Sequence, residues 1–107
     1  MRLGILLLIN ICLTTTLQEA YNEASSYEDY EKYIVLEPGQ TYYGGLGIYE
    51  GDVFIDCQGS IIDLQNQTGI WIYADENYLA TLDIQYCNII NGAYYGLSFS
   101  GIATGTI

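Results

Sequence analysis

Acidic side chains are the first residues of this sequence whose type could do chemistry. Four of them lie where apolar and polar residues alternate: Asp52, Asp56, Asp63 and Asp83. Two carboxylates can share acid–base or nucleophilic work in glycoside hydrolysis, and carboxylate oxygens are ligands that Ca²⁺ prefers. The spacing pairs none of these acids with another. We therefore expect them to be solvated, with no catalytic residue and no cofactor in this stretch; a Ca²⁺ site is the alternative.

Aromatic side chains are the stronger candidates for binding, because their flat rings present a large apolar face on which sugar rings can stack. If Ile70 and Ile72 face the interior, the residues that alternate with them are exposed on one strand. The opposite orientation, with Trp71 and Tyr73 in the core, is the alternative. The seven aromatic candidates for binding are Tyr42, Tyr43, Tyr49, Trp71, Tyr73, Tyr94 and Tyr95. Of these, Trp71, Tyr73, Tyr94 and Tyr95 are predicted to contact carbohydrate.

The composition excludes several classes of function. The 107 residues include 13 Asp and Glu, two Lys and Arg, and no His, which gives a formal net charge of −11. Without His, the chain cannot build a Ser-His-Asp triad or a His-bearing zinc site. Two basic residues are too few to form a basic surface that binds nucleic acid. The excess of acidic residues also repels anionic membrane surfaces. The partner that we expect is a polysaccharide or a cell-surface glycan.

The N-terminus has the layout of an export signal. A short positive start, Met1-Arg2, precedes an apolar run over residues 3–13 and then a polar stretch. The run is too short to cross about 30 Å of hydrocarbon as a helix, which needs about 20 residues. We expect a signal peptide over residues 1–17, no membrane span after its cleavage, and a secreted or otherwise extracytoplasmic protein, in a periplasm or at a cell surface.

Residues 18–32 differ in character from the remainder of the chain. They read QEAYNEASSYEDYEK, with five acids and no Leu, Ile, Val or Phe. A segment of this composition has little apolar surface to bury. We predict an acidic polar linker here, with a frayed helix as the alternative.

From residue 33 onward, short apolar runs are separated by glycines, and apolar and polar residues alternate with a period of two. The alternation predicts three inward rows: Val53, Ile55 and Cys57; Leu82, Ile84 and Tyr86; Leu97 and Phe99. Three pairs of segments also match: 55–63 with 84–91, skipping one residue near Gly59; 69–72 with 96–99; and 80–84 with 103–107. The first match places Asp63 and Asn91 at the same corner, so we predict that they are neighbours.

A repeat of 23–29 residues built from short strands is typical of a repeat architecture. The stretch over residues 33–107 resembles the right-handed parallel β-helix family, also called pectate-lyase-like. The resemblance rests on VLEPGQTYYGGLGIYEGDVFIDCQGSIIDL and on LDIQYCNIINGAYYGLSFSG. It implies an all-β fold, a right-handed parallel β-helix of about two coils with an N-terminal cap, incomplete at its C-terminus.

The resemblance also sets the expected function, although fold alone does not choose an activity. We expect a secreted or cell-surface β-helix module that contacts carbohydrate or acts as a scaffold and is non-catalytic in this stretch. The alternative is the N-terminal part of a polysaccharide lyase or glycoside hydrolase whose active site lies beyond residue 107.

The repeat also bears on the cysteines. It matches Cys57 with Tyr86 and Cys87 with Gly59, so the two cysteines are not at equivalent positions of the repeat. We expect two buried thiols, with a disulfide as the alternative. The tripeptide Asn66-Gln67-Thr68 is an N-glycosylation sequon, which is meaningful only in a eukaryotic secretory protein.

Overall fold

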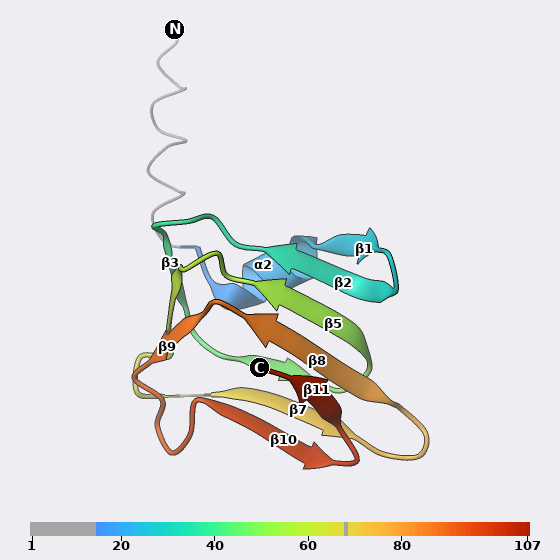
Figure 1. Cartoon of the computed structure of the whole chain (residues 1–107). Coiled ribbons are helices and arrows are strands. Elements are labelled where there is room, and N and C mark those ends of the chain that lie inside the picture. Colours follow the sequence, from blue (N-terminus) through green and yellow to red (C-terminus); the bar gives the residue numbers. More distant parts are fainter. Residues whose placement is uncertain (1–14, 68) are drawn as a thin grey trace, which may run out of the picture.

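The computed structural model describes residues 15–67 and 69–107, and Figure 1 shows how their elements are arranged. The described residues form one short helix, α2 (Leu17–Glu23), and eleven strands. The strands are β1 (Ser25–Tyr27), β2 (Tyr30–Val35), β3 (Thr41–Tyr43), β4 (Leu46–Ile48), β5 (Gly51–Asp56), β6 (Ile61–Asp63), β7 (Ile70–Ala74), β8 (Ala80–Gln85), β9 (Asn88–Ile90), β10 (Leu97–Gly101) and β11 (Thr104–Thr106). The predicted signal peptide lies outside the described residues except for its last three positions.

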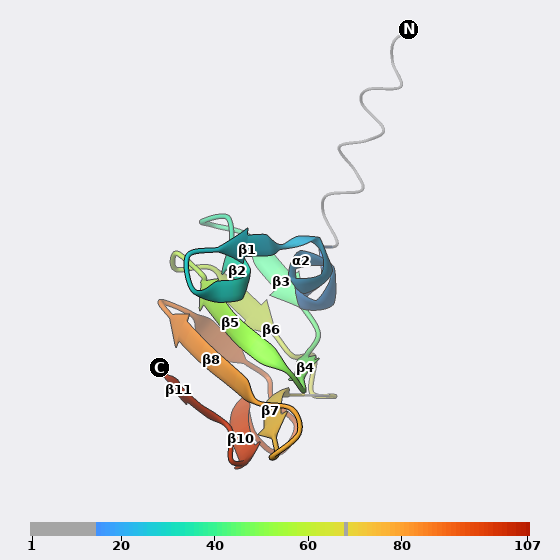
Figure 2. The same cartoon turned by 90° about the vertical axis from the view of Figure 1, so that its right-hand side faces the viewer.

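The strands belong to three sheets. The largest has the order β1-β2-β5-β8-β11, and the two others have the orders β10-β7-β4 and β3-β6-β9. Neighbouring strands run parallel throughout, except that β1 and β2 form an antiparallel pair. Figure 2 shows β2, β5, β8 and β11 of the largest sheet one below the other, with α2 and β1 at the top and β10 and β11 at the bottom.

The fold class expected from the sequence, an all-β right-handed parallel β-helix of about two coils, is wrong. The described residues form three separate small sheets and one short helix, and the sheet that contains β1 is mixed. They do not build one clear, continuous coil. One physical reason is that residues 17–27, instead of extending the parallel pairing, form a helix and an antiparallel strand that close the end of the sheet beside β2.

Several of the predicted residue pairings are nevertheless confirmed. Ile70 pairs with Leu97 across β7 and β10, and Thr81 pairs with Thr104 across β8 and β11. The sequence distance between paired residues changes at the corner after β5. Asp56 pairs with Gln85, whereas Ile61 pairs with Asn88, so the second corner is two residues shorter than the first. The sequence match skips only one residue there.

The shorter corner explains a second correction, which concerns the cysteines. Cys57 and Cys87 form a disulfide, with their Cα atoms 4.9 Å apart, and are not the two separate thiols expected. Tyr86 has a positive φ of 55°, a left-handed conformation that turns the chain sharply. Tyr86 is therefore exposed rather than inward as predicted, and the next residue, Cys87, reaches Cys57.

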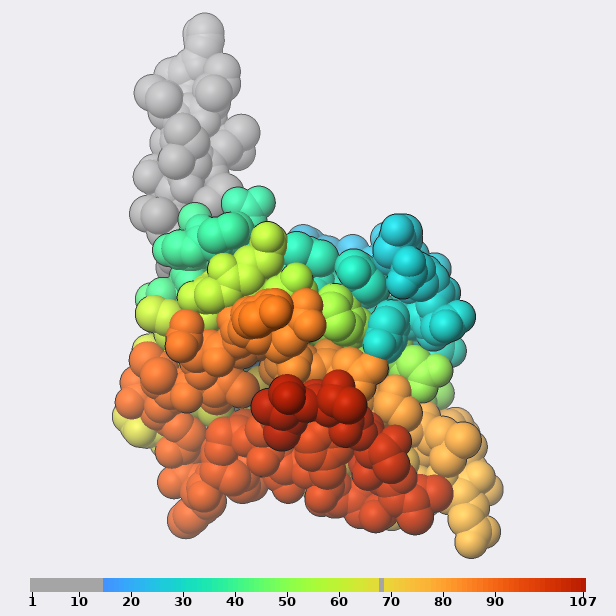
Figure 3. All heavy atoms as spheres, viewed as in Figure 1, coloured from blue at the N-terminus to red at the C-terminus, as the bar shows by residue number. Residues whose placement is uncertain are grey.

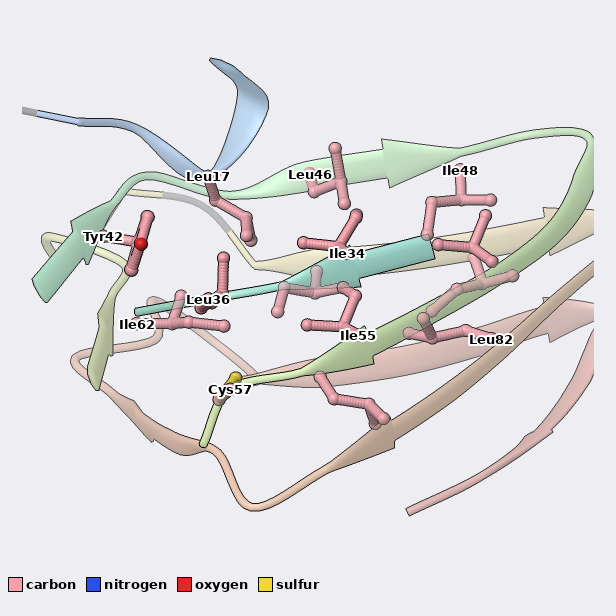
Figure 4. Close-up of a cluster of buried hydrophobic side chains, with 14 of the residues drawn as sticks. Leu17, Ile34, Leu36, Tyr42, Leu46, Ile48, Ile55, Cys57, Ile62 and Leu82 are labelled. Carbon is pink, nitrogen blue, oxygen red and sulfur yellow. The ribbon is translucent and has the colours of Figure 1, made fainter. Parts of the chain in front are cut away.

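The core lies between the three sheets, where each of the strands β2 to β8 contributes buried side chains. Figure 4 shows these side chains pointing toward one another. Val53, Ile55, Leu82 and Ile84 are buried as the alternation predicted, and Leu97 and Phe99 pack against them half-buried. The buried apolar residues are Leu17, Ile34, Leu36, Tyr42, Leu46, Ile48, Val53, Ile55, Cys57, Ile62, Leu64, Ile70, Ile72, Ala74, Ala80, Leu82 and Ile84.

The segment expected as an acidic linker, residues 18–32, contains most of α2, all of β1 and the start of β2. The helix begins with a capping box, in which the Thr16 hydroxyl accepts from the Glu19 amide and the Glu19 carboxylate accepts from the Thr16 amide. Leu17 is fully buried, which contributes about 1.5–3 kcal/mol. Lys32 in β2 holds the other end of the helix by donating to the Asn22 and Ala24 carbonyl oxygens. Most other side chains of this range are exposed, as those of a linker would be.

Candidate functional site

The outer face of the β10-β7-β4 sheet carries the aromatic residues singled out in the sequence. Ile70 and Ile72 are fully buried, so Trp71 and Tyr73 point outward with 39% and 37% of their surface exposed. The alternative in which both rings belong to the core is therefore wrong. Because strand side chains alternate, the parallel pairing of β7 with its two neighbours fixes which residues flank these rings.

Trp71 is held in place by its neighbours on this face. Its indole Nε1 donates a hydrogen bond to the Ser100 hydroxyl oxygen at 2.8 Å. The Tyr49 ring meets it edge-on with the centroids 5.8 Å apart, and the Tyr73 ring is tilted against it at 6.4 Å. These contacts fix the orientation of the indole while leaving part of it exposed to solvent.

Two glycines let tyrosine rings lie close to the sheet beside Trp71. A Cβ on Gly47 would come within 2.9 Å of the Tyr49 hydroxyl oxygen, and a Cβ on Gly69 would overlap the Tyr95 ring. Gly47 also pairs directly with Trp71 across β4 and β7. The missing side chains therefore leave space that the aromatic rings occupy.

An open hollow of about 440 Å³ lies among these residues, and we call it the aromatic hollow. It is lined by Gln18, Gly45, Leu46, Gly47, Tyr49, Gln67, Gly69, Trp71 and Tyr95. The lining contains no charged side chain. The two glutamines supply amide donors and acceptors, and the three aromatic residues supply apolar ring surface. The hollow can therefore hold a neutral ligand that has both apolar faces and hydroxyl groups.

The structure brings together some of the four predicted contact residues and not others. Trp71 and Tyr95 line the aromatic hollow, and Tyr73 lies beside Trp71 without lining it. Tyr94 is 97% exposed and stands apart from it. Tyr49 also lines the hollow; it is one of the seven aromatic candidates but not one of the four predicted to contact carbohydrate. The match of residues 45–48 (GLGI) with residues 69–72 (GIWI), which places Tyr49 near the ring pair on β7, could have promoted it to that group.

A second group of aromatic rings lies on the outer face of the largest sheet. Tyr33 stacks on Phe54 with the centroids 4.7 Å apart, and Tyr30 lies 5.2 Å from Phe54. Tyr27 meets Tyr33 edge-on at 4.8 Å. These rings pack on one another, and none of them lines the aromatic hollow.

The candidate carboxylates are occupied by neighbours within their own sheets. Asp52 accepts from the Thr81 hydroxyl at 2.8 Å. Asp83 accepts from the Tyr30 phenol at 2.5 Å and from the Thr106 hydroxyl at 2.9 Å. The bond to Asp83, more than desolvation, raises the pKa of Tyr30 to about 12, because it stabilises the neutral phenol.

The two remaining acids stabilise corners of the chain. Asp56 accepts from the Gln58 amide and Asp63 from the Gln65 amide, which are local turn contacts. Asp63 also accepts from the Asn91 side-chain amide at 3.0 Å, so the predicted contact between these two residues is confirmed. None of the four candidate acids lines the aromatic hollow.

Metal ligands and membrane-spanning helices are not found in the described part of the chain. Within residues 15–67 and 69–107, no three His, Cys, Asp or Glu side chains gather closely enough to hold a metal ion. The helix among these residues does not have the length and apolar character needed to cross a membrane.

Comparison with known proteins gave no match: no family model, no curated protein and no solved structure is similar to this chain. The functional argument therefore rests on the geometry and chemistry of the aromatic hollow.

Proposed function

We propose that this protein binds a neutral carbohydrate in the aromatic hollow and does not act on it chemically. The observation that carries the proposal is Trp71, an indole fixed by Ser100 yet 39% exposed at the wall of an uncharged hollow. Indole and phenol rings offer apolar faces to sugar C–H groups. Holding the ring in advance lowers the entropy lost when a ligand binds.

Polar groups around the rings give the hollow a means of orienting the ligand. Gln18 and Gln67 each offer two amide donors and one carbonyl acceptor to sugar hydroxyls. A few placed polar groups in an otherwise apolar site are typical of small-molecule recognition. Gly45, which also lines the hollow, carries no side chain that would keep a ligand away from the backbone, whereas the Tyr49 and Tyr95 rings already cover Gly47 and Gly69.

Charge favours a neutral glycan over an acidic one. The hollow has no basic side chain to pair with a carboxylate or sulfate, and the chain carries a formal net charge of −11. Both facts disfavour uronate-rich or sulfated polysaccharides. The candidate carboxylates that could support hydrolysis lie elsewhere and accept hydrogen bonds from their own neighbours, which favours binding over catalysis.

We further propose that the protein works outside the cytoplasm, as a secreted or surface protein. The disulfide between Cys57 and Cys87 supports this location, because such bonds persist in oxidising compartments. The export-signal layout of the N-terminal residues supports it independently.

The test uses the chain's single tryptophan as the reporter. Trp71 fluorescence is titrated with a panel of neutral oligosaccharides of glucose, mannose, xylose and N-acetylglucosamine, and with acidic oligogalacturonate for comparison. We expect a saturable shift with at least one neutral series and none with the acidic one. Calorimetry then compares variants, and Trp71→Ala should weaken binding at least about tenfold, which corresponds to about 1.4 kcal/mol.

The matched control is Tyr94→Ala, which removes an aromatic ring that is 97% exposed and lies outside the hollow. It should leave affinity unchanged, whereas Tyr95→Ala should lower it. The absence of any fluorescence shift across the neutral panel would refute carbohydrate binding. Equal loss of affinity in the Tyr94 and Tyr95 variants would refute the location of the site.

A further inference from the structure

A single Asn–Gly step occurs in the sequence, at Asn91–Gly92, and it lies in the connection between β9 and β10. Every other asparagine is followed by a residue with a side chain, and no aspartate precedes a glycine. Asn91 is exposed to solvent. In Figure 3 the segment between β9 and β10, in orange, lies at the surface of the face in view. Of all the asparagines, Asn91 therefore has the neighbour whose backbone nitrogen is least hindered, because glycine has no Cβ.

The backbone amide of Gly92 is also not engaged in a hydrogen bond. In the described part of the chain its N–H donates to no acceptor. The amides that follow two other exposed asparagines do donate: the Gln67 N–H to the Leu64 carbonyl oxygen at 3.2 Å, and the Tyr78 N–H to the Asp75 carboxylate at 2.9 Å. The Gly92 nitrogen can therefore react without first breaking a hydrogen bond.

Asn91 holds two neighbouring turns of the chain together at this corner. Its side-chain Nδ2 donates to Asp63 Oδ1 at 3.0 Å, and its carbonyl oxygen accepts from the Asn66 amide at 2.7 Å. One residue earlier, the Ile90 carbonyl oxygen accepts from the Leu64 amide at 2.9 Å. Because an ionised carboxylate can only accept hydrogen bonds, the contact with Asp63 depends on the NH2 group of Asn91.

We propose that Asn91 is a site of spontaneous deamidation and that the reaction opens this corner. The Gly92 nitrogen bonds to Cγ of Asn91, the bond from Cγ to Nδ2 breaks, and Nδ2 leaves as ammonia with the proton from the Gly92 amide. Water then hydrolyses the cyclic imide. Cleavage at Cγ gives aspartate, and cleavage at the backbone carbonyl carbon gives isoaspartate, in which the main chain runs through Cβ and Cγ. Water is the only other reactant, and no group is oxidised or reduced.

Both products change the contact with Asp63 in the same direction. Each lacks the Nδ2 donor, and each places a second carboxylate beside the first, where like charges repel. Isoaspartate also adds a methylene to the main chain and so displaces the carbonyl oxygen that accepts from Asn66. Neither Asn91 nor Gly92 lines the aromatic hollow, so this inference is independent of the proposed carbohydrate binding.

The first test follows the full chain during incubation in neutral buffer. Peptide mapping by mass spectrometry measures the replacement of NH2 by OH at each asparagine, with the exposed Asn22 and Asn77 as internal controls. Conversion at Asn91 should be at least about tenfold faster than at either control, which corresponds to a barrier lower by about 1.4 kcal/mol. Hydrogen exchange of the Leu64 and Asn66 amides should become faster in the converted protein. An Asn91 that stays intact, or that converts no faster than the controls, overturns the proposal.

The second test isolates the repulsion from Asp63. Asn91→Asp copies one product and should lower the urea midpoint of unfolding, followed by Trp71 fluorescence. In an Asp63→Asn background the same substitution should lower the midpoint much less, because the new carboxylate then faces an amide donor. Asn77→Asp, in the exposed loop between β7 and β8, is the matched control for added charge and should have a smaller effect than Asn91→Asp.

The double-variant comparison can contradict the assigned consequence in two ways. An Asn91→Asp variant as stable as the wild type would show that the corner does not depend on the amide. An equal loss with Asp63 and with Asn at that position would show that repulsion between the two carboxylates is not the cause. Circular dichroism of each variant checks that the fold is kept, so that a lower midpoint reports on stability alone.

Discussion

The disulfide between Cys57 and Cys87 gives the sharpest prediction about stability. The bond joins residues 30 apart in sequence, and on the chain-entropy account a closed loop of that size contributes about 4 kcal/mol. A domain of this length has a free energy of unfolding of about 5–15 kcal/mol in total. Reduction should therefore remove a large share of the stability, because the unfolded chain regains the freedom that the bond denies it.

The assay is urea unfolding followed by Trp71 fluorescence, with and without a reductant. A Cys12→Ser background prevents exchange with the third cysteine. With a urea dependence of about 1–3 kcal/mol/M, a loss of about 4 kcal/mol lowers the unfolding midpoint by roughly 2 M. The double variant Cys57→Ala/Cys87→Ala should resemble the reduced protein and be insensitive to reductant.

Two outcomes would contradict this reasoning. Oxidised and reduced protein that unfold at the same urea concentration would show that the bond does not restrict the unfolded chain. A double variant much less stable than the reduced wild type would assign the effect to the packing of Cys57, which is fully buried, and not to the cross-link.

Two further predictions concern a phenol and a glycine. Because Asp83 raises the pKa of Tyr30 to about 12, the contribution of this bond to stability is complete below pH 10 and is lost as the pH rises from about 10 to about 12. Site-resolved NMR titration should show the pKa fall toward 10 in Asp83→Asn, and an unchanged value would contradict the assigned cause. Gly101→Ala should cost at least about 2 kcal/mol in urea unfolding, because φ is +66° and the new Cβ would overlap the Ala74 carbonyl oxygen. Gly39→Ala, with φ +79° and open space around the Cβ, should cost only about 1–2 kcal/mol, and equal losses would show that the overlap is relieved.

The alternation of residues along each strand could be predicted because it is a local property. A strand points successive side chains to opposite faces, so the inward rows at Val53 and Ile55 and at Leu82 and Ile84 follow from the order of residues alone. The matched segments also gave the correct partner for Ile70. The predicted pairings and side-chain orientations failed at the corners, where the chain leaves a strand.

The corner after β8 shows why. It contains one left-handed residue, Tyr86, whereas the corner after β5 contains two, Gln58 and Gly59, and the two-residue difference in length brings Cys87 to Cys57. The period of two carries no information about such a turn. The pairing of the cysteines and the exposure of Tyr86 therefore had to come from the folded chain.

The N-terminal part of the fold shows a different limit. The residues of the capping box, Thr16 and Glu19, are visible in the sequence and are a known sign of a helix start. A seven-residue helix is too short to be stable alone, so its formation depends on burying Leu17 against strands that are remote in sequence. Composition favoured a linker because it counts only the residues present and not the surface on which they pack.

The sequence by itself determined which residues alternate, that residues 84–107 have no charged side chain, and that aromatic residues are the candidates for binding. Only the tertiary structure decided that Trp71 faces outward and that Tyr49 and Tyr95 lie beside it around one hollow. The physical reason is that side-chain direction within a strand is set by neighbours along the chain. The gathering of residues from β4, β7 and the loop before β10 depends instead on pairing between strands that are more than 20 positions apart.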